Sequence, residues 1–235
     1  MKAFVIGLSR IPTSMKSSEA TVAALKSYGL DATHWEGTYG SDAEEIFAVE
    51  GRVLSDTSFK GLPVDEEYRK SCSRPGVMGC FHSHYRLWKH CVELNESILI
   101  FEDDVIFERA FIPVEWSDVL LVATGKTVHL QEFYSEKLYR PSGPPTAAGF
   151  KGKVMPGAVG YGLTPKGAAK LTEYYRTIYL PADNAMNRRV VDLQCHNYLM
   201  GRAATDIDGK KSLTKTKMWT KLKDKQQFAN IAPND

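Results

Sequence analysis

The 235-residue sequence has few cysteines, and none of the four is spaced for a familiar cysteine motif. Cys72, Cys80, Cys91 and Cys195 form no C-x-x-C pair, which argues against a zinc ribbon or a thiol-redox protein. A chain of this length buries a full hydrophobic core without disulfide or metal cross-links. Because Cys80 and Cys91 fall on the apolar side of a helical pattern, we predict reduced, buried thiols that serve as small core residues.

Long apolar runs and a strong net charge are also absent. The apolar stretch 3–8 is too short for the core of a signal peptide, and no later stretch approaches the length needed to span a bilayer. These two absences predict a cytoplasmic protein, in a bacterium or in a virus-infected host cell. The formal charge of +2 is too small to indicate a nucleic-acid-binding protein by itself, and no internal repeat is visible.

The pattern of apolar residues predicts one α/β domain over residues 1–200. It opens with a strand at 3–8, a helix that is capped by Ser17 or Ser18 and stops at Gly29, and a strand at 31–35. Many nucleotide-binding domains begin in this β-α-β order and bind their ligand at the carboxyl ends of the strands. We expect further helices at 77–91 and 165–178, the latter capped by Thr164, and further strands at 97–101, 119–123, 127–133 and 157–163.

Three stretches show no clear period. Residues 38–75 indicate a long excursion with short helical turns, and such long irregular segments are often functional. Residues 140–153 are rich in proline and glycine, which is typical of a mobile loop. Residues 201–235 form a predicted basic C-terminal tail, with lysines at intervals from 210 to 225.

An acidic triplet ends the predicted strand at 97–101. Alternate side chains of a strand share a face, so Glu102 and Asp104 are expected to point one way and Asp103 the other. Two carboxylates on one side of a strand end make a hard-oxygen site of the kind that Mn²⁺ or Mg²⁺ prefers. The alternative is a solvated acidic turn that caps the next element.

The triplet stands inside a longer recognisable block. The block reads Gly76-Val-Met-Gly-Cys-Phe-His-Ser-His84 with Leu87-Trp88, followed by Ile98-Leu-Ile-Phe-Glu-Asp-Asp-Val105. Around it stand Phe4-Val-Ile-Gly-Leu8 with Arg10, Trp35-Glu-Gly37, Gly157-Ala-Val-Gly-Tyr-Gly-Leu-Thr-Pro-Lys-Gly-Ala168 and Leu180-Pro-Ala-Asp183. In this order the segments, covering most of residues 3–190, resemble glycosyltransferase family 25, which includes lipooligosaccharide sugar transferases and collagen hydroxylysine galactosyltransferases. The resemblance implies a GT-A-type nucleotide-sugar-binding fold with a mixed central sheet flanked by helices, a UDP-sugar donor, and inversion at the anomeric carbon.

Within such a transferase we predict roles for particular residues. Glu102 and Asp104 would bind the metal, Mn²⁺ or Mg²⁺, and Asp103 would contact the donor ribose. Asp183 would be either the base that takes the acceptor proton or a further metal ligand, unless it only caps a helix beginning near residue 184. His84 would orient the donor phosphate or the metal carboxylates, unless it is a hydrogen-bonded core residue.

Further donor contacts are expected near both ends of the chain. The resemblance assigns Arg10 and Glu36, after the first two strands, to the UDP-sugar, although Gly7 replaces the asparagine common in the family's first strand. Lys210 and Lys211 would close over the donor diphosphate, or else form a solvated charged turn.

The sequence leaves the acceptor open. A surface saccharide of the lipopolysaccharide type fits a tail whose lysines, from 210 to 225, touch an anionic membrane. A hydroxymethylated DNA base, as in phage or viral DNA modification, fits the same lysines through phosphate contacts. A third alternative is a non-catalytic nucleotide-sugar-binding module. In either enzyme, the loop 140–153 is a predicted lid over the donor.

Overall fold

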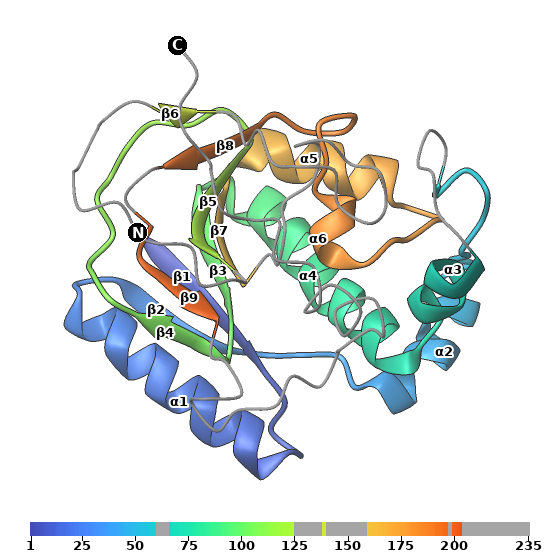
Figure 1. Cartoon of the computed structure of the whole chain (residues 1–235), viewed down its shortest axis with the longest axis horizontal. Coiled ribbons are helices and arrows are strands. Elements are labelled where there is room, and N and C mark those ends of the chain that lie inside the picture. The colour runs from blue at the N-terminus through green and yellow to red at the C-terminus, as the bar shows by residue number, and fades with distance from the viewer. Residues whose placement is uncertain (60–65, 125–137, 140–158, 197–198, 204–235) are drawn as a thin grey trace, which may run out of the picture.

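The computed structural model describes residues 1–59, 66–124, 138–139, 159–196 and 199–203, which form a sheet flanked by helices (Figure 1). The strands are β1 (Lys2–Gly7), β2 (Asp31–Glu36), β3 (Ile98–Glu102), β4 (Val105–Phe107), β5 (Val119–Thr124), β6 (Leu138–Tyr139), β7 (Gly160–Leu163), β8 (Leu193–His196) and β9 (Gly201–Ala203). The helices are α1 (Pro12–Ser27), α2 (Gly40–Val49), α3 (Glu66–Cys72), α4 (Pro75–Leu94), α5 (Pro165–Tyr174) and α6 (Ala182–Ala185).

The sheet is mixed in direction. Its main path runs β2-β1-β3-β7-β5-β8-β6, and β9 links β4 to β5. β1 is parallel to β2 and β3, whereas β7 is antiparallel to both β3 and β5. The predicted α/β class with a mixed central sheet is therefore confirmed, and the architecture is compatible with a GT-A-like fold.

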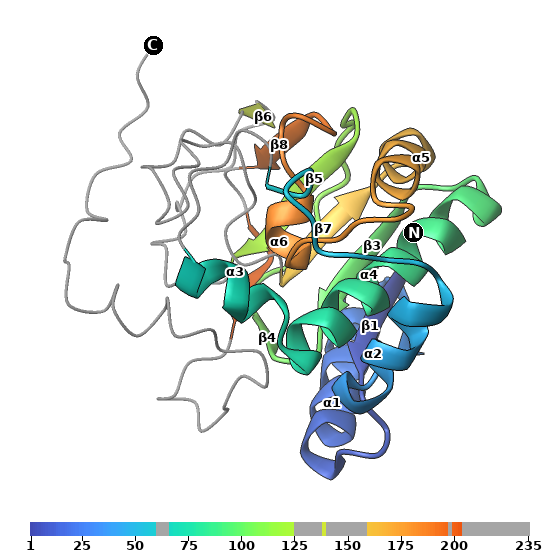
Figure 2. The same ribbon diagram turned by 90° about the vertical axis from the view of Figure 1, so that its right-hand side faces the viewer.

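The strands divide their side chains between two apolar cores. In β1, Phe4 faces one core while Ala3 and Val5 face the other. In β3, Ile98 and Ile100 likewise alternate with their neighbours. Helix α4, packed between α2 and α5, covers the first core, and α1 lies against β1 and β2 on the opposite side (Figure 2). Two covered faces explain why these strands read as continuous apolar runs rather than as alternating patterns.

Two helix boundaries differ from their predictions. Helix α1 starts at Pro12, so the predicted cap at Ser17 or Ser18 was wrong; proline at the first helical position already sets the required φ angle. Helix α5 ends at Tyr174 rather than at residue 178. Beyond it, the buried Arg52 guanidinium donates to the carbonyl oxygens of Tyr175 and Ile178, which satisfies these two acceptors outside a helix. The Thr164 cap is confirmed by the hydrogen bond from the Gly167 N–H to its hydroxyl, 3.1 Å.

The C-terminal segment contributes to the sheet as far as it is described. β9 spans Gly201–Ala203 and pairs with β4 and β5, so the described residues after position 200 belong to the sheet. The predicted strand at 127–133, the predicted lid at 140–153, and Lys210 and Lys211 lie outside the described residues.

Gly7 lies where α1 packs closely against the sheet. A Cβ atom at this position would lie 2.7 Å from Ser18 Cβ and 3.0 Å from His34 Cε1, so the space an asparagine would need is filled.

We expect Gly7→Ala to destabilise the fold by about 1–3 kcal/mol because it overpacks this contact. Urea denaturation measures the change. In a Ser18→Gly background, which removes the clashing Cβ, the same substitution should cost clearly less. Equal costs in both backgrounds would show that the contact with Ser18 is not the cause.

Candidate functional site

The register of the parallel strands assembles the site. Gly7 at the end of β1 pairs with Glu36 at the end of β2, and Ile6 pairs with Glu102 at the end of β3. Parallel strands bring their carboxyl ends to one edge, so the two glutamates flank the end of β1. Residues far apart in the sequence are thereby placed at a common edge, where α/β domains bind their ligands.

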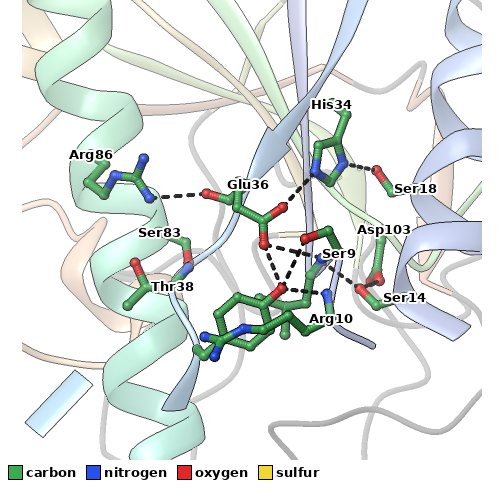
Figure 3. A network of polar contacts seen from close by, with 12 residues as sticks. Ser9, Arg10, Ser14, Ser18, His34, Glu36, Thr38, Ser83, Arg86 and Asp103 are labelled. Carbon is green, nitrogen blue, oxygen red and sulfur yellow. Dashed lines mark hydrogen bonds and ion pairs between the residues drawn. The ribbon is translucent and has the colours of Figure 1, made fainter. Parts of the chain in front are cut away.

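Glu36 is held by a network of hydrogen bonds at this edge (Figure 3). Its carboxylate accepts from the Tyr39 hydroxyl at 2.6 Å and from the Ser9 backbone N–H at 3.2 Å, and it lies 3.2 Å from His34 Nε2. Burial alone would raise the pKa of Glu36, but the hydrogen bonds from Tyr39, His34 and Ser9 outweigh it and lower the pKa to about 2. Glu36 therefore stays ionised throughout the neutral and mildly acidic range.

Arg10 joins the same network through Tyr39. The Arg10 backbone N–H donates to the Tyr39 hydroxyl at 2.6 Å, and the guanidinium lies 3.5 Å from the centre of the Tyr39 ring. The guanidinium also pairs with Asp42 at 2.5 Å on an exposed surface. The structure thus brings together Arg10 and Glu36, the two residues predicted to bind the UDP-sugar. Sequence reasoning missed Tyr39, although it follows the Trp35-Glu-Gly37 segment by only two positions.

We expect Tyr39→Phe to raise the pKa of Glu36 from about 2 toward its ordinary value of 4.5, because the substitution removes the shortest of these hydrogen bonds. Since the folded-state pKa lies below the unfolded one, Glu36 stabilises the fold above about pH 4.5 and loses that contribution as the pH falls toward 2. NMR titration of the Glu36 carboxyl carbon measures the midpoint. Tyr28→Phe, which changes an exposed tyrosine just after α1, is the control; an unchanged midpoint in Tyr39→Phe would contradict the assignment.

The acidic triplet divides between the two faces of the sheet. Asp103 belongs to the α1 side, where its carboxylate accepts from the Ser14 hydroxyl (Figure 3). Its backbone carbonyl accepts from the Thr21 hydroxyl at 3.1 Å. Glu102 faces α4 instead, and the charge of Asp104 acts on Cys80 of that helix. Glu102 therefore lies on the opposite side of the sheet from Asp103, and Asp103 and Asp104 form a turn rather than a continued strand.

On the α4 side, Glu102 meets His84 and Cys80. His84 Nε2 lies 3.5 Å from Glu102 Oε1, and Cys80 Sγ lies 4.0 Å from the same oxygen. Burial raises the pKa of Glu102 to about 8, and the charges of Asp103 and Asp183 add to the effect. Burial also lowers the pKa of His84 to about 4. At neutral pH the ligand-free pair is therefore an uncharged carboxylic acid beside an uncharged imidazole.

His84 is a hydrogen-bonded core residue, which is one of the two roles that the sequence left open. Its side chain is fully buried, and Nδ1 lies 2.8 Å from the Tyr161 hydroxyl, which also accepts from the Trp88 indole N–H at 2.9 Å. It is therefore a hydrogen-bonded core residue on one side, and on the other it faces Glu102. Cys80 is only partly buried beside this carboxylate, so its prediction as an ordinary core thiol was wrong; the four-residue spacing from His84 on one helix was the available signal.

Asp183 lies in the first turn of α6, where Pro181 is the N-cap. The alternative of Asp183 as an N-cap was therefore wrong. Its charge contributes to the raised pKa of both Glu102 and Cys80 and acts on His84. The structure thus brings together Glu102 and His84, and the charge of Asp183 acts on both.

An α/β fold with acidic groups gathered at the carboxyl edge of parallel strands is an architecture that sugar-nucleotide enzymes use. The sequence profile of glycosyltransferase family 25 (LPS biosynthesis protein) matches residues 55–186, more than half of the chain. The chain belongs to this family. The matched region contains Cys80, His84, Glu102 and Asp183, whereas Arg10 and Glu36 precede it.

Proteins of animals are similar to part of the chain. A glycosyltransferase 25 family member of Aedes aegypti is 39% identical over 79 residues, 31% of this chain and 13% of that protein. Procollagen galactosyltransferase 2 of Homo sapiens is 41% identical over 73 residues, 28% of this chain and 12% of that protein. A protein of Rattus norvegicus named as a probable inactive glycosyltransferase 25 family member 3 is 32% identical over 143 residues, 55% of this chain and 24% of that protein. The matches span at most about a quarter of these relatives.

Among the helices of the described residues, none is both long and apolar enough to cross a membrane.

Proposed function

We propose that the chain is an inverting glycosyltransferase that moves a sugar from a UDP-sugar to an acceptor hydroxyl with the help of Mn²⁺ or Mg²⁺. The observation that carries this proposal is the placement of the Glu102 carboxyl group at the carboxyl ends of the parallel strands β1 and β3, where burial, followed by the charges of Asp103 and Asp183, raises its pKa to about 8. Such a group favours a bound cation, because a cation offsets charge that the protein alone accommodates poorly.

The residues present fit a divalent cation. Glu102 and Asp104 stand two positions apart at the end of β3 and offer carboxylate oxygens, the ligands that Mn²⁺ and Mg²⁺ prefer. When bound, such a cation stabilises the negative charge of the departing nucleoside diphosphate as a Lewis acid.

The other residues bind the donor and move the proton. Glu36 is a fixed, ionised acceptor for donor hydroxyl groups, and Asp103, held by Ser14, is the proposed contact of the ribose. Arg10 supplies positive charge at the same edge. We assign Asp183 as the general base: as the acceptor oxygen bonds to the anomeric carbon and the bond to the diphosphate breaks, Asp183 takes the acceptor proton. One such displacement inverts the anomeric carbon.

We propose a surface saccharide as the acceptor, and the similarity to known proteins supports this choice more than the geometry of the site does. The family's description names lipopolysaccharide biosynthesis, which favours a surface saccharide. The name of the human relative favours a procollagen acceptor for that protein, and a hydroxymethylated DNA base remains the alternative that would use the lysines from 210 to 225. The relatives named inactive favour a second candidate function, a nucleotide-sugar-binding module without turnover.

A panel of UDP-sugars tests the proposal and separates the two candidates. We expect one UDP-sugar to be hydrolysed slowly with Mn²⁺ and not after chelation with EDTA. A donor at 100 times its Kd stabilises the folded state by about 2.7 kcal/mol, which corresponds to a rise in Tm of roughly 5–10 °C for a chain of this size. Stabilisation without hydrolysis or transfer would support the binding module, and neither effect with any UDP-sugar would exclude both.

A further inference from the structure

Three side chains with different donor atoms converge beside the end of β3. Cys80 and His84 are one helical turn apart on α4, and Glu102 ends the strand that α4 covers. The thiol sulfur, the imidazole nitrogen and a carboxylate oxygen all lie within 4.8 Å of one another. Within the described ranges, this is the one place where three potential metal ligands come so close.

The imidazole provides an independent indication of a ligand. His84 is 1% exposed, and its Nε2 atom makes no hydrogen bond; the nearest carboxylate oxygen, on Glu102, is 3.5 Å away. A buried polar atom without a partner is unfavourable and rarely occurs without a functional reason. The opposite nitrogen is fixed by Tyr161, which is the arrangement that orients histidine ligands in metal sites.

From this geometry we propose that Cys80, His84 and Glu102 form a binding site for a thiophilic divalent cation of the Zn²⁺ class. Tetrahedral Zn²⁺ with ordinary bond lengths holds its nitrogen and oxygen ligands about 3.3 Å apart and its sulfur and oxygen ligands about 3.5 Å apart. The corresponding separations here are 3.5 Å and 4.0 Å, so small side-chain shifts complete the site.

The mixture of donor atoms decides which cation binds. Thiolate and imidazole ligands select Zn²⁺ and Co²⁺, whereas Mn²⁺ and Mg²⁺ prefer oxygen ligands. Three protein ligands leave a fourth position open for water or for a nearby carboxylate, and the charge of Asp183 acts on all three groups. The site is therefore suited to an exchangeable cation rather than to a closed structural one.

This site shares Glu102 with the proposed oxygen site. A cation bound by Cys80 and His84 draws the Glu102 carboxylate toward α4, so Zn²⁺ would compete with Mn²⁺ and inhibit sugar transfer. Only this inhibition rests on the proposed function; the binding itself does not.

Cobalt binding tests the site without any sugar donor. We expect Co²⁺, added to the reduced full chain, to give one equivalent of a thiolate-to-cobalt charge-transfer band, which Zn²⁺ abolishes. Cys80→Ser should remove the band and weaken Zn²⁺ binding by more than about 100-fold, since loss of a supporting residue alone costs 10–100-fold. Cys91→Ser makes the same chemical change on the same helix, away from the site, and should keep the band.

Circular dichroism and Tm show whether each variant is folded, and His84→Gln provides a second variant that leaves the thiol intact. In His84→Gln the band should weaken and Zn²⁺ affinity should fall. The proposal is overturned if the wild-type protein gives no thiolate band, if Cys80→Ser keeps it, or if folded Cys91→Ser loses it. Zn²⁺ binding without any sugar transfer would leave this site standing and contradict the proposed function instead.

Discussion

Replacing Asp183 by asparagine is expected to lower sugar transfer by about 10²–10⁴-fold, the usual contribution of a general base, while the protein stays folded. The asparagine side chain has nearly the same size and shape as that of aspartate, and Pro181 rather than Asp183 is the N-cap of α6. Loss of an acidic group from the first turn of a helix costs only about 0.3–1 kcal/mol. The substitution also removes one of the charges that raise the pKa of Glu102.

The kinetic pattern distinguishes a base from a metal ligand. If Asp183 is the base, kcat falls while the donor KM and the Mn²⁺ concentration needed for half-maximal activity stay near their wild-type values. If it is a ligand, the Mn²⁺ requirement rises instead. Asp56→Asn is the matched control, because Asp56 is almost fully exposed and pairs with Arg69 at the surface. A kcat within tenfold of wild type for Asp183→Asn would remove Asp183 from the mechanism.

Local patterns predicted the elements of the fold well. The apolar run at 3–8, the stripe from Val77 to Cys91 and the run ending at Glu102 correspond to β1, α4 and β3. These signals are strong because each element is covered by another layer and must carry apolar side chains. Residues 38–75 gave no period, since the structure there uses short helices, α2 and α3, and the described residues 50–59 after α2 form neither a helix nor a strand.

The site was predictable only where a motif ran along a single element. The triplet at 102–104 was found because it ends a strand, and the resemblance added Asp183. Contacts across the sheet depend on strand register and on helix placement, which local patterns do not specify. For this reason the proximity of Cys80 to Glu102, the support of His84 by Tyr161 and the joining of Arg10 to Glu36 through Tyr39 were visible only in the structure.

Some of the relatives are named inactive, so similarity to this family does not by itself establish turnover. The matches to animal relatives cover between 28% and 56% of this chain. In the proposed mechanism, turnover depends on two separate features, the base on α6 and the carboxylates at the end of β3. Variants of the second feature therefore test whether this chain is an enzyme independently of Asp183.

Asp104→Asn and Glu102→Gln are each expected to reduce Mn²⁺-dependent turnover by at least about 100-fold, because the loss of several kcal/mol of charge stabilisation corresponds to that factor or more. The two variants should differ in cobalt binding. Asp104 does not belong to the Cys80–His84–Glu102 group, so Asp104→Asn should keep the thiolate-to-cobalt band, while Glu102→Gln should weaken it.

Glu108→Gln provides the control for both variants, since Glu108 follows β4 and its carboxylate pairs with Arg202 on β9 at 3.4 Å. Its turnover should equal that of the wild-type protein. Calorimetric titration of each variant with Mn²⁺ in the presence of UDP measures cation binding directly.

Near-normal Mn²⁺-dependent turnover in Asp104→Asn would show that the oxygen site is misassigned. If Glu102→Gln alone is inactive and Asp104→Asn is unaffected, the cation is held on the α4 side, by the group that contains the thiol and the imidazole.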